Sequence, residues 1–268
     1  KQIAEIWNHI YLKPFGLGLH LLSAISNLYS AASLGLVGIC YWEFHGMAAP
    51  EFVLDRVVGT ACVCTFLAAT YWGTAFSSLA SAALIMFLPA LVIIARIDPI
   101  EKAGQRLTAN WAGAVYLGGT AFFGLALLGN TDWLFTMCVV IWGADSGAYF
   151  AGRAFGKHKL HKDVSPNKTI EGLVGGLLTS LVAAAVISDT LMADSGVGLA
   201  PCLIAAAVGG LLGPLGDLVE SAFKRAYNVK DSGTLLPGHG GFLDRLDALL
   251  LAMPFFALYG SYLGVVTF

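Results

Sequence analysis

Charged side chains are scarce in this sequence, and their scarcity excludes an ordinary soluble domain. Lys, Arg, Asp and Glu make up 12% of the 268 residues, whereas soluble domains carry about 25%. Hydrophobic residues make up 57%, and the mean hydropathy is +0.74. Ten-residue stretches in which apolar and polar side chains alternate are lacking, which excludes a transmembrane β-barrel. The composition therefore predicts an all-α, polytopic helical membrane protein.

Cysteine patterns for metal or redox chemistry are also lacking. The five cysteines lie in or beside apolar stretches, and Cys62 and Cys64 form CxC instead of CxxC. No histidine pattern completes a zinc site, so we interpret the cysteines as small buried apolar side chains. We find no domain linker, internal repeat or low-complexity run, and no cleavable signal peptide in the first 16 residues. We expect a single integral membrane domain over residues 1–268.

Eight stretches are long and apolar enough to cross a bilayer, since a spanning helix needs roughly 20 such residues. They cover about 17–42, 53–71, 74–95, 109–128, 131–151, 170–192, 197–222 and 246–268. The second and third nearly touch, which predicts a tight helical hairpin or a broken helix. Residues 1–16 are typical of an interfacial helix. We therefore expect eight or nine transmembrane helices, with 1–130 as the N-terminal helices and 131–268 as the half that carries the polar motifs.

The basic residues gather on one side of this predicted topology. Of the 15 Lys and Arg residues, 13 lie in or beside the connections after the first, third, fifth and seventh apolar stretches. The connections after the second, fourth and sixth stretches have none. Cytoplasmic loops of membrane proteins carry an excess of Lys and Arg. We expect the four basic connections, and any site among them, to face the cytoplasm.

Charge is concentrated near the C-terminus, and beside a bilayer such a concentration indicates a site. Residues 217–247 hold nine of the chain's 32 Lys, Arg, Asp and Glu side chains. Four polar residues at i, i+3, i+4 and i+7 would share one helix face: Asp217, Glu220, Ser221 and Lys224. The preceding Pro214 predicts a kink that opens a cavity. We interpret Asp217 as functional, whereas Glu220 either serves the site or pairs with Lys224 at the helix end.

A glycine-rich loop follows, and glycines let backbone N–H groups approach an anion. It runs from Lys230-Asp231-Ser232-Gly233 to Pro237-Gly238-His239-Gly240-Gly241, and His239 either binds the ligand or is merely solvated. The next helix opens with Asp244 and Asp247, which together with Asp217 would form an all-oxygen nest for Mg²⁺. Four basic residues would then hold phosphates: Lys224, Arg225, Lys230 and Arg245. Such a combination points to phosphoryl or nucleotidyl transfer.

A second polar cluster lies upstream. Asp145 interrupts an otherwise apolar stretch, and we interpret it as functional because an acid is costly there. The following loop contains Lys157, Lys159 and Lys162 and then Ser165-Pro166-Asn167-Lys168-Thr169-Ile170-Glu171-Gly172. The lysine run is equally explained as a positive-inside anchor. Thr169 is equally explained as an ordinary helix cap.

These stretches resemble the phosphatidate cytidylyltransferases, also called CDP-diacylglycerol synthases. Residues 221–247 match the family's pattern S-x-F-K-R-x4-K-D-x-G-x2-L-P-x-H-G-G-F-x-D-R-L-D without a departure. Two further stretches are similar to the family: Asp145-Ser146-Gly147-Ala148-Tyr149, and Ser165-Pro166-Asn167-Lys168-Thr169 with Glu171-Gly172. The resemblance covers about residues 140–250, whereas the first hundred residues are similar only as hydrophobic spans.

The resemblance implies an enzyme of phospholipid biosynthesis that condenses CTP with phosphatidic acid to CDP-diacylglycerol and pyrophosphate, with Mg²⁺ as its cofactor. It also implies a homodimer in the bacterial inner membrane, in contact with membrane lipid; no nucleic-acid partner is expected. The family's metal-binding positions fall on Asp217 and Asp244, to which we add Glu220. The question of a second cation stays open. Residues 131–268 would then be the catalytic half.

The expected site contains two sets of residues. The candidate catalytic residues are Asp217, Asp244, Lys224, Arg225 and Asp247. The candidate substrate-binding residues are Lys230, Asp231, His239, Gly240, Gly241, Arg245, Ser165, Lys168, Glu171, Asp145 and Ser221. Two alternative functions fit the same features less well. One is a CTP-dependent polyprenol or lipid kinase, which would release CDP. The other is an ion-coupled transporter, since intramembrane acids and broken helices also mark ion pathways.

Overall fold

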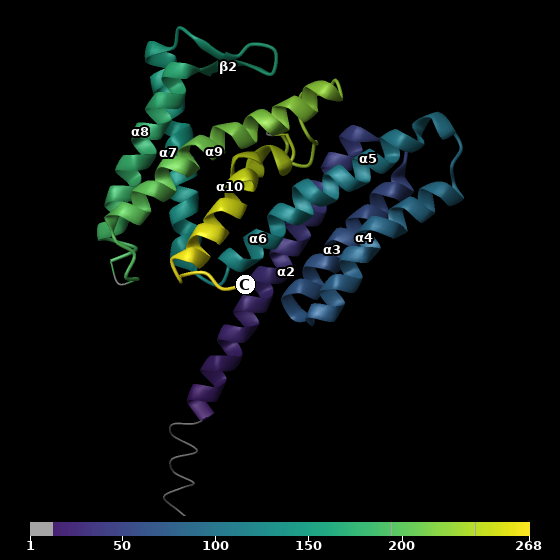
Figure 1. The fold of residues 1–268 in the computed structure, drawn as a ribbon, viewed down its shortest axis with the longest axis horizontal. Coiled ribbons are helices and arrows are strands. Elements are labelled where there is room, and N and C mark those ends of the chain that lie inside the picture. The colour runs from purple at the N-terminus through teal and green to yellow at the C-terminus, as the bar shows by residue number, and fades with distance from the viewer. Residues whose placement is uncertain (1–12, 194, 239) are drawn as a thin grey trace, which may run out of the picture.

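The computed structural model of the chain describes residues 13–193, 195–238 and 240–268, and these are mostly helical (Figure 1). The long helices are α2 (Lys13–Ala48), α3 (Val53–Trp72), α4 (Ala75–Ala95), α7 (Thr131–Phe155), α8 (Ile170–Asp189), α9 (Leu199–Ala226) and α10 (Leu243–Tyr262). A 3-10 turn (Ile100–Lys102) leads into one continuous helical run of α5 (Ala103–Gly113), a π-helical stretch (Ala114–Gly119) and α6 (Thr120–Leu127). These elements confirm the all-α prediction.

All eight apolar stretches predicted from the sequence fall for most of their length in helices or in that helical run. Among the described residues, five helices are long and apolar enough to cross a membrane: α3, α4, α7, α8 and α9. The chain is therefore a helical membrane protein, and the count of eight or nine spans stays a prediction. The predicted interfacial helix at 1–16 lies outside the described residues for most of its length.

Local sequence signals set the helix boundaries. At the tight turn between α3 and α4, the Thr74 hydroxyl accepts a hydrogen bond from the Ser77 amide, and the Ser77 hydroxyl accepts one from the Thr74 amide. This reciprocal capping box starts α4 as a separate helix. The second and third apolar stretches therefore form the predicted tight hairpin and not a broken helix. Asn130 caps α7 and Thr169 caps α8, so the ordinary-cap interpretation of Thr169 is confirmed.

Two segments differ from the sequence-based expectation. The stretch 156–169, expected to be a loop, contains an antiparallel hairpin of β1 (Lys159–His161) and β2 (Ser165–Thr169). The last apolar stretch was expected to be helical to residue 268, but α10 ends at Tyr262. It ends there because Gly264 takes a positive φ of 76° and the Val265 and Val266 amides turn back to the Gly260 carbonyl.

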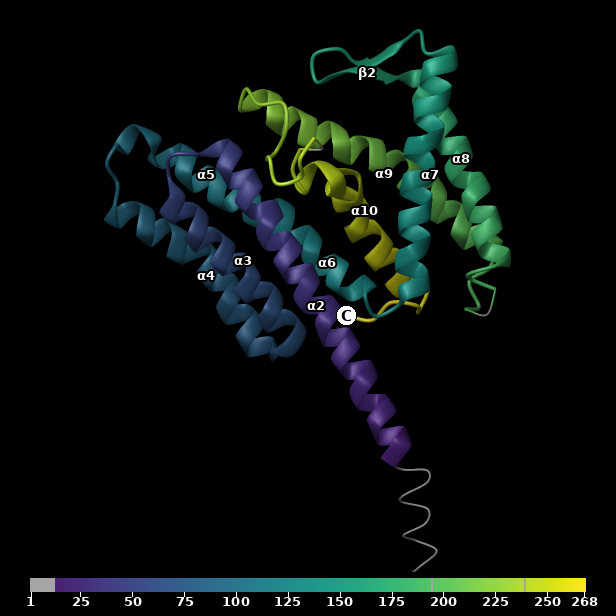
Figure 2. The same ribbon diagram turned by 180° about the vertical axis from the view of Figure 1, so that it is seen from behind.

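Two hydrophobic cores flank α10. One is built around Trp133 and Ile141 of α7 and Phe256 of α10. The other includes Phe44 of α2 and Leu250 of α10. Figures 1 and 2 show α10 between the N-terminal helices and the α7–α9 group. The start of α10, which carries the DRLD sequence, is therefore placed where the two halves of the chain meet.

Helices α7 and α8 pack closely against each other. A Cβ on Gly175 of α8 would overlap the Cβ of Ala151 on α7, and one on Gly147 would overlap the Thr179 hydroxyl. Small residues at such positions let membrane helices approach each other. On its outer side α8 exposes an apolar stripe that includes Val174, Leu178, Val182 and Val186, as expected of a surface that faces lipid.

The basic connections lie at one end of the molecule. Figures 1 and 2 both place the β-hairpin, the α9–α10 loop and the α4–α5 connection at the upper end. The α3–α4 turn, the α8–α9 loop and the C-terminus lie at the opposite end. This arrangement agrees with the sidedness predicted from the distribution of Lys and Arg.

A buried ion pair joins α3 to α5 in the N-terminal half. The Arg106 guanidinium donates from Nε and Nη2 to the Asp55 carboxylate at 2.5 and 2.9 Å, and both residues are 2% exposed. It also stacks on the Phe52 ring, 4.3 Å from the ring centre, and donates to the Arg96 carbonyl. Arg106 is one of the basic residues that follow the third apolar stretch, and this pair makes it a packing residue of the helices.

Candidate active site

A cavity of about 750 Å³ opens between α7, α8, α9 and the β-hairpin. Four of the predicted site residues line it: Asp145, Ser165, Lys168 and Asp217. The Asp217 carboxylate pairs with the Lys168 ammonium at 2.8 Å and accepts a hydrogen bond from the Ser221 hydroxyl at 3.1 Å. The Lys168 ammonium also donates to the Pro214 carbonyl at 3.0 Å. An acid from α9 and a base from the hairpin thus face one cavity.

Pro214 itself lies inside α9, which continues as one helix to Ala226. Proline lacks an N–H, so it removes one helical hydrogen bond. Its own carbonyl oxygen holds Lys168. A cavity does lie beside Pro214, which is one of the residues that line it, whereas the kink expected at Pro214 stays a prediction.

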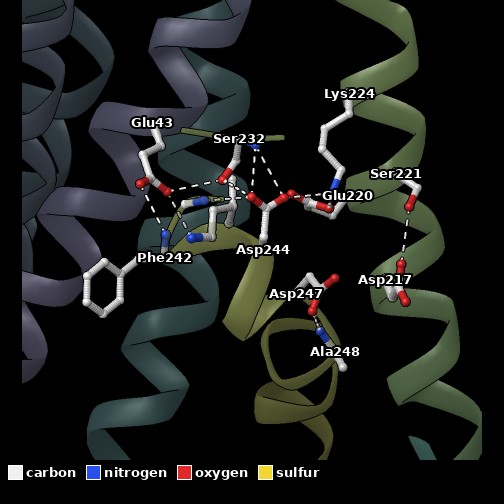
Figure 3. A network of polar contacts seen from close by, with 12 residues as sticks. Glu43, Asp217, Glu220, Ser221, Lys224, Ser232, Phe242, Asp244, Asp247 and Ala248 are labelled. Atoms are coloured by element: carbon white, nitrogen blue, oxygen red, sulfur yellow. Dashed lines mark hydrogen bonds and ion pairs between the residues drawn. The ribbon is translucent and has the colours of Figure 1, made fainter. Parts of the chain in front are cut away.

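A second group of charges lies one to two turns further along α9 (Figure 3). The Lys224 ammonium pairs with the Glu220 carboxylate on its own helix and with the Asp244 carboxylate of α10 at 2.7 Å. Glu220 is fully buried, and the other two side chains are largely buried, with Asp244 10% and Lys224 13% exposed. The acid–base alternative for Glu220 and Lys224 is therefore realised, with Asp244 as a third member.

The Asp244 carboxylate is also held by the backbone of the α9–α10 loop. It accepts hydrogen bonds from the Gly241 amide at 2.8 Å and from the Ser232 amide and hydroxyl, both at 3.0 Å. Burial alone would raise the pKa of Asp244, but these bonds and the one from Lys224 outweigh it and lower the pKa to about 2. Asp244 is therefore a carboxylate at neutral pH, and its oxygens anchor the loop.

The outer side of the loop borders a hollow of about 510 Å³. Four predicted substrate-binding residues line it: Lys230, Asp231, Gly240 and Arg245. Gly240 has a positive φ of 80°, a conformation that glycine adopts without strain. The hydrogen bond from the Leu236 amide to the Gly240 carbonyl, at 3.0 Å, closes the turn. His239 lies outside the described residues, so its predicted role stays a prediction.

Two of the other predicted residues, Glu171 and Arg225, lie apart from these groups. Glu171 accepts hydrogen bonds from the Lys157 and His158 amides and contacts His158 Nδ1 at 2.6 Å, which fixes the base of the hairpin. Arg225 is exposed near the end of α9. The carboxylate of Asp247, on α10, accepts a hydrogen bond from the Ala248 amide at 2.7 Å (Figure 3) and lies close enough to Asp217 and Lys224 for their charges to interact. Gly241, by contrast, is buried beside Asp244.

The predicted three-carboxylate nest is not formed within the described part of the chain. No group of three or more His, Cys, Asp and Glu side chains there is arranged to hold a metal. Asp217 and Asp145 line the same cavity, which is compatible with Mg²⁺ because this ion often binds one or two carboxylates and keeps its waters. Asp244 and Glu220 are instead engaged by Lys224. The magnesium site stays a prediction, with the better fit at Asp217.

Sequence reasoning missed two residues of this region. Glu43 of α2 is 7% exposed, and its carboxylate accepts hydrogen bonds from the Phe242 and Leu243 amides. Ser232 donates to Asp244 and lies within hydrogen-bond distance of Glu43. The signal that singled out Asp145, an acid in an apolar helix, was present for Glu43 as well. For Ser232 the sequence carried no comparable signal.

Comparisons with known proteins agree with the resemblance in the motifs. A family model described as "Cytidylyltransferase family" matches residues 10–263. A phosphatidate cytidylyltransferase of Bacillus subtilis is 42% identical over 178 residues, which cover 65% of this chain and 64% of the relative. One of Haemophilus influenzae is 50% identical over 125 residues, or 45% and 43% of the two chains. One of Staphylococcus saprophyticus is 50% identical over 116 residues, or 43% and 44%. The matched regions thus span less than two thirds of these relatives.

Proposed function

The chain belongs to the cytidylyltransferase family, and from this premise we propose that it is a CTP:phosphatidate cytidylyltransferase. It would condense CTP with phosphatidic acid to CDP-diacylglycerol and pyrophosphate. The observation that carries this proposal is the cavity in which Asp217, Lys168 and Asp145 meet, at the basic end of a helical membrane protein. The names of the bacterial relatives support the same reaction and substrates.

The reaction needs charge neutralisation more than it needs a base. A phosphate oxygen of phosphatidic acid would attack the α-phosphorus of CTP, and the bond to pyrophosphate would break. Because the nucleophile is already an anion, positioning and electrostatic stabilisation would supply most of the rate. Lys168 and Arg153 line the cavity and would hold phosphate oxygens there. Lys230 and Arg245, in the neighbouring hollow, would hold others.

Mg²⁺ would be held by Asp217 together with Asp145, and when bound it would neutralise triphosphate charge and orient the leaving group. Both carboxylates line the cavity, and Lys168 already provides a counter-charge for Asp217. Asp244, the other motif acid, would contribute by fixing the loop. Asp244 would become a metal ligand only if Lys224 released it.

We place the site on the cytoplasmic face of a bacterial inner membrane. CTP is a cytosolic solute, and 13 of the 15 basic residues lie in or beside connections on that face. Phosphatidic acid would arrive sideways from the bilayer, with its acyl chains along the apolar helices. The homodimer and a second cation stay predictions.

The test is turnover of the purified protein in detergent with labelled CTP, phosphatidic acid and Mg²⁺, with and without EDTA. We expect CDP-diacylglycerol and pyrophosphate, formed only while the metal is available. CDP together with a phosphorylated lipid would replace the proposal with the kinase alternative. If a protein shown to be folded has no turnover, the transporter alternative would be favoured. If turnover persists in EDTA, the reaction does not require Mg²⁺.

A further inference from the structure

Glu43 brings a carboxylate from the N-terminal half of the chain to the start of α10. Its Oε1 accepts a hydrogen bond from the Phe242 amide at 3.1 Å, and its Oε2 accepts one from the Leu243 amide at 2.9 Å (Figure 3). The first N–H groups of a helix lack intrahelical partners and carry partial positive charge. No side chain of the motif caps α10 at its N-cap residue, Phe242. Glu43 supplies that cap from α2.

Two glycines of the motif leave the space that this carboxylate occupies. A Cβ on Gly233 would lie 2.7 Å from Glu43 Oε1, 2.9 Å from its Cδ and 3.0 Å from its Cγ. A Cβ on Gly241 would overlap Glu43 Oε2 and the Ser232 hydroxyl. Neither glycine has a positive φ, so close approach, not backbone conformation, favours glycine there. We expected the motif glycines to admit a phosphate; these two admit Glu43.

The Glu43 carboxylate is also linked to Asp244. The Ser232 hydroxyl lies 3.2 Å from Glu43 Oε2 and 3.0 Å from Asp244 Oδ2. A hydroxyl has one hydrogen, so it is shared between two carboxylates that the Phe242, Leu243 and Gly241 amides also stabilise. Asp244 in turn holds Lys224. Displacing Glu43 would therefore move the loop and the acid–base group behind it.

We propose that Glu43 is a positioning residue of the active site, an inference that rests on the proposed cytidylyltransferase function. It fixes the loop 230–241, whose outer side carries Lys230 and Asp231, and it fixes the start of α10. It also borders a hollow of about 870 Å³ between α2, α3 and the loop, but both of its oxygens are engaged by the loop and by α10. The site would thus extend beyond residues 131–268 into α2.

The first experiment compares Glu43→Gln with wild type in kcat and KM for both substrates, well below the melting temperature. A glutamine keeps the shape but presents an NH2 group to one of the two amides, so we expect kcat to fall at least about tenfold. Asn110→Ala is the matched control, since Asn110 is 1% exposed and bonds Tyr41 and His45 in the same half. It should lower the melting temperature and leave kcat within about twofold, which separates positioning from stability.

A second experiment tests the steric fit. In the otherwise wild-type protein, Gly233→Ala should lower kcat at least about tenfold, because the new methyl group meets Glu43. Added to the Glu43→Ala variant, where that space is vacant, the same substitution should lower kcat by at most a further factor of about two. Gly35→Ala, whose Cβ would meet nothing within 4 Å, is the glycine control. Wild-type kcat in Glu43→Gln or in Gly233→Ala, or additive losses in the double variant, would overturn the inference. If Glu43→Gln fails to fold, Gly233→Ala alone decides between these outcomes. If wild type itself lacks cytidylyltransferase activity, the proposed function fails and the inference falls with it.

Discussion

Replacing Lys224 with Met removes the cation that lies between two buried carboxylates. Glu220 is fully buried and Asp244 is 10% exposed, so neither acid gains bulk water when the ammonium is lost. Methionine keeps the apolar stem of the lysine, and packing should change little. Removing one partner of a buried ion pair typically costs about 3–5 kcal/mol, because it leaves an uncompensated buried charge.

The structure places the expected cost at the lower end of that range. Asp244 retains hydrogen bonds from Ser232 and Gly241, so most of the penalty falls on Glu220. We expect the free energy of unfolding to fall by about 3 kcal/mol. The Lys102–Glu51 pair provides a matched control, because its side chains are 46% and 40% exposed. Lys102→Met should cost about 0–1 kcal/mol.

The assay is unfolding in detergent, followed by tryptophan fluorescence during heating and during titration with a denaturing detergent. A double variant, Lys224→Met with Glu220→Gln, completes the measurement. An amide needs no counter-charge, so this variant should recover more than half of the stability that Lys224→Met loses. If Lys224→Met were as stable as Lys102→Met, the two carboxylates would not depend on Lys224, and the reasoning would be refuted.

Three further changes should have distinct outcomes. Asp217→Asn should lower formation of CDP-diacylglycerol at least about 100-fold with an unchanged melting temperature, because Asp217 lines the cavity and is 36% exposed; wild-type turnover would remove Asp217 from the site. Asp55→Ala should destabilise the fold by about 3–5 kcal/mol, measured by thermal unfolding, because it leaves the Arg106 guanidinium buried without its carboxylate. Gly175→Ala should cost about 1–3 kcal/mol in the same assay, since the new methyl overlaps Ala151, and an unchanged melting temperature would contradict the close packing of α7 and α8.

The helices and the contacts within one helix were predictable because they depend on short-range patterns. Apolar stretches of about 20 residues locate the helices, and Thr-Ser and Asn caps set their boundaries. The spacing on α9 predicted that Asp217, Glu220, Ser221 and Lys224 share one face, and the Glu220–Lys224 pair was one of its two alternatives for Glu220; the structure adds the bond from Ser221 to Asp217. These relations hold whatever the rest of the chain does.

The partners from distant segments were not predictable, because sequence spacing says nothing about them. Lys168 reaches Asp217 across 49 positions of the chain, and Glu43 reaches Leu243 across 200. Arg106 follows the third apolar stretch in the sequence, and only the structure shows that Asp55 of α3 lies against it. In each case the contact forms only because particular helices pack against each other. Which helices pack together depends on many small packing interactions along the chain and not on one sequence motif.

The spacing along α9 also explains why one motif divides into two neighbourhoods. Asp217 and Lys224 share a face, but seven residues of helix separate them by about 10 Å along the axis. At the level of Asp217 the α7–α8 pair and the hairpin enclose a cavity; at the level of Lys224, α10 and the loop held by Glu43 fill the space. Charge that is continuous in the sequence therefore lines a cavity at one level, where the proposed function would use it for substrate, and is packed between helices at the other. If the proposed function holds, the acids best placed for chemistry are the two that line the cavity, Asp217 and Asp145, and the motif's second acid, Asp244, would support them by holding the loop.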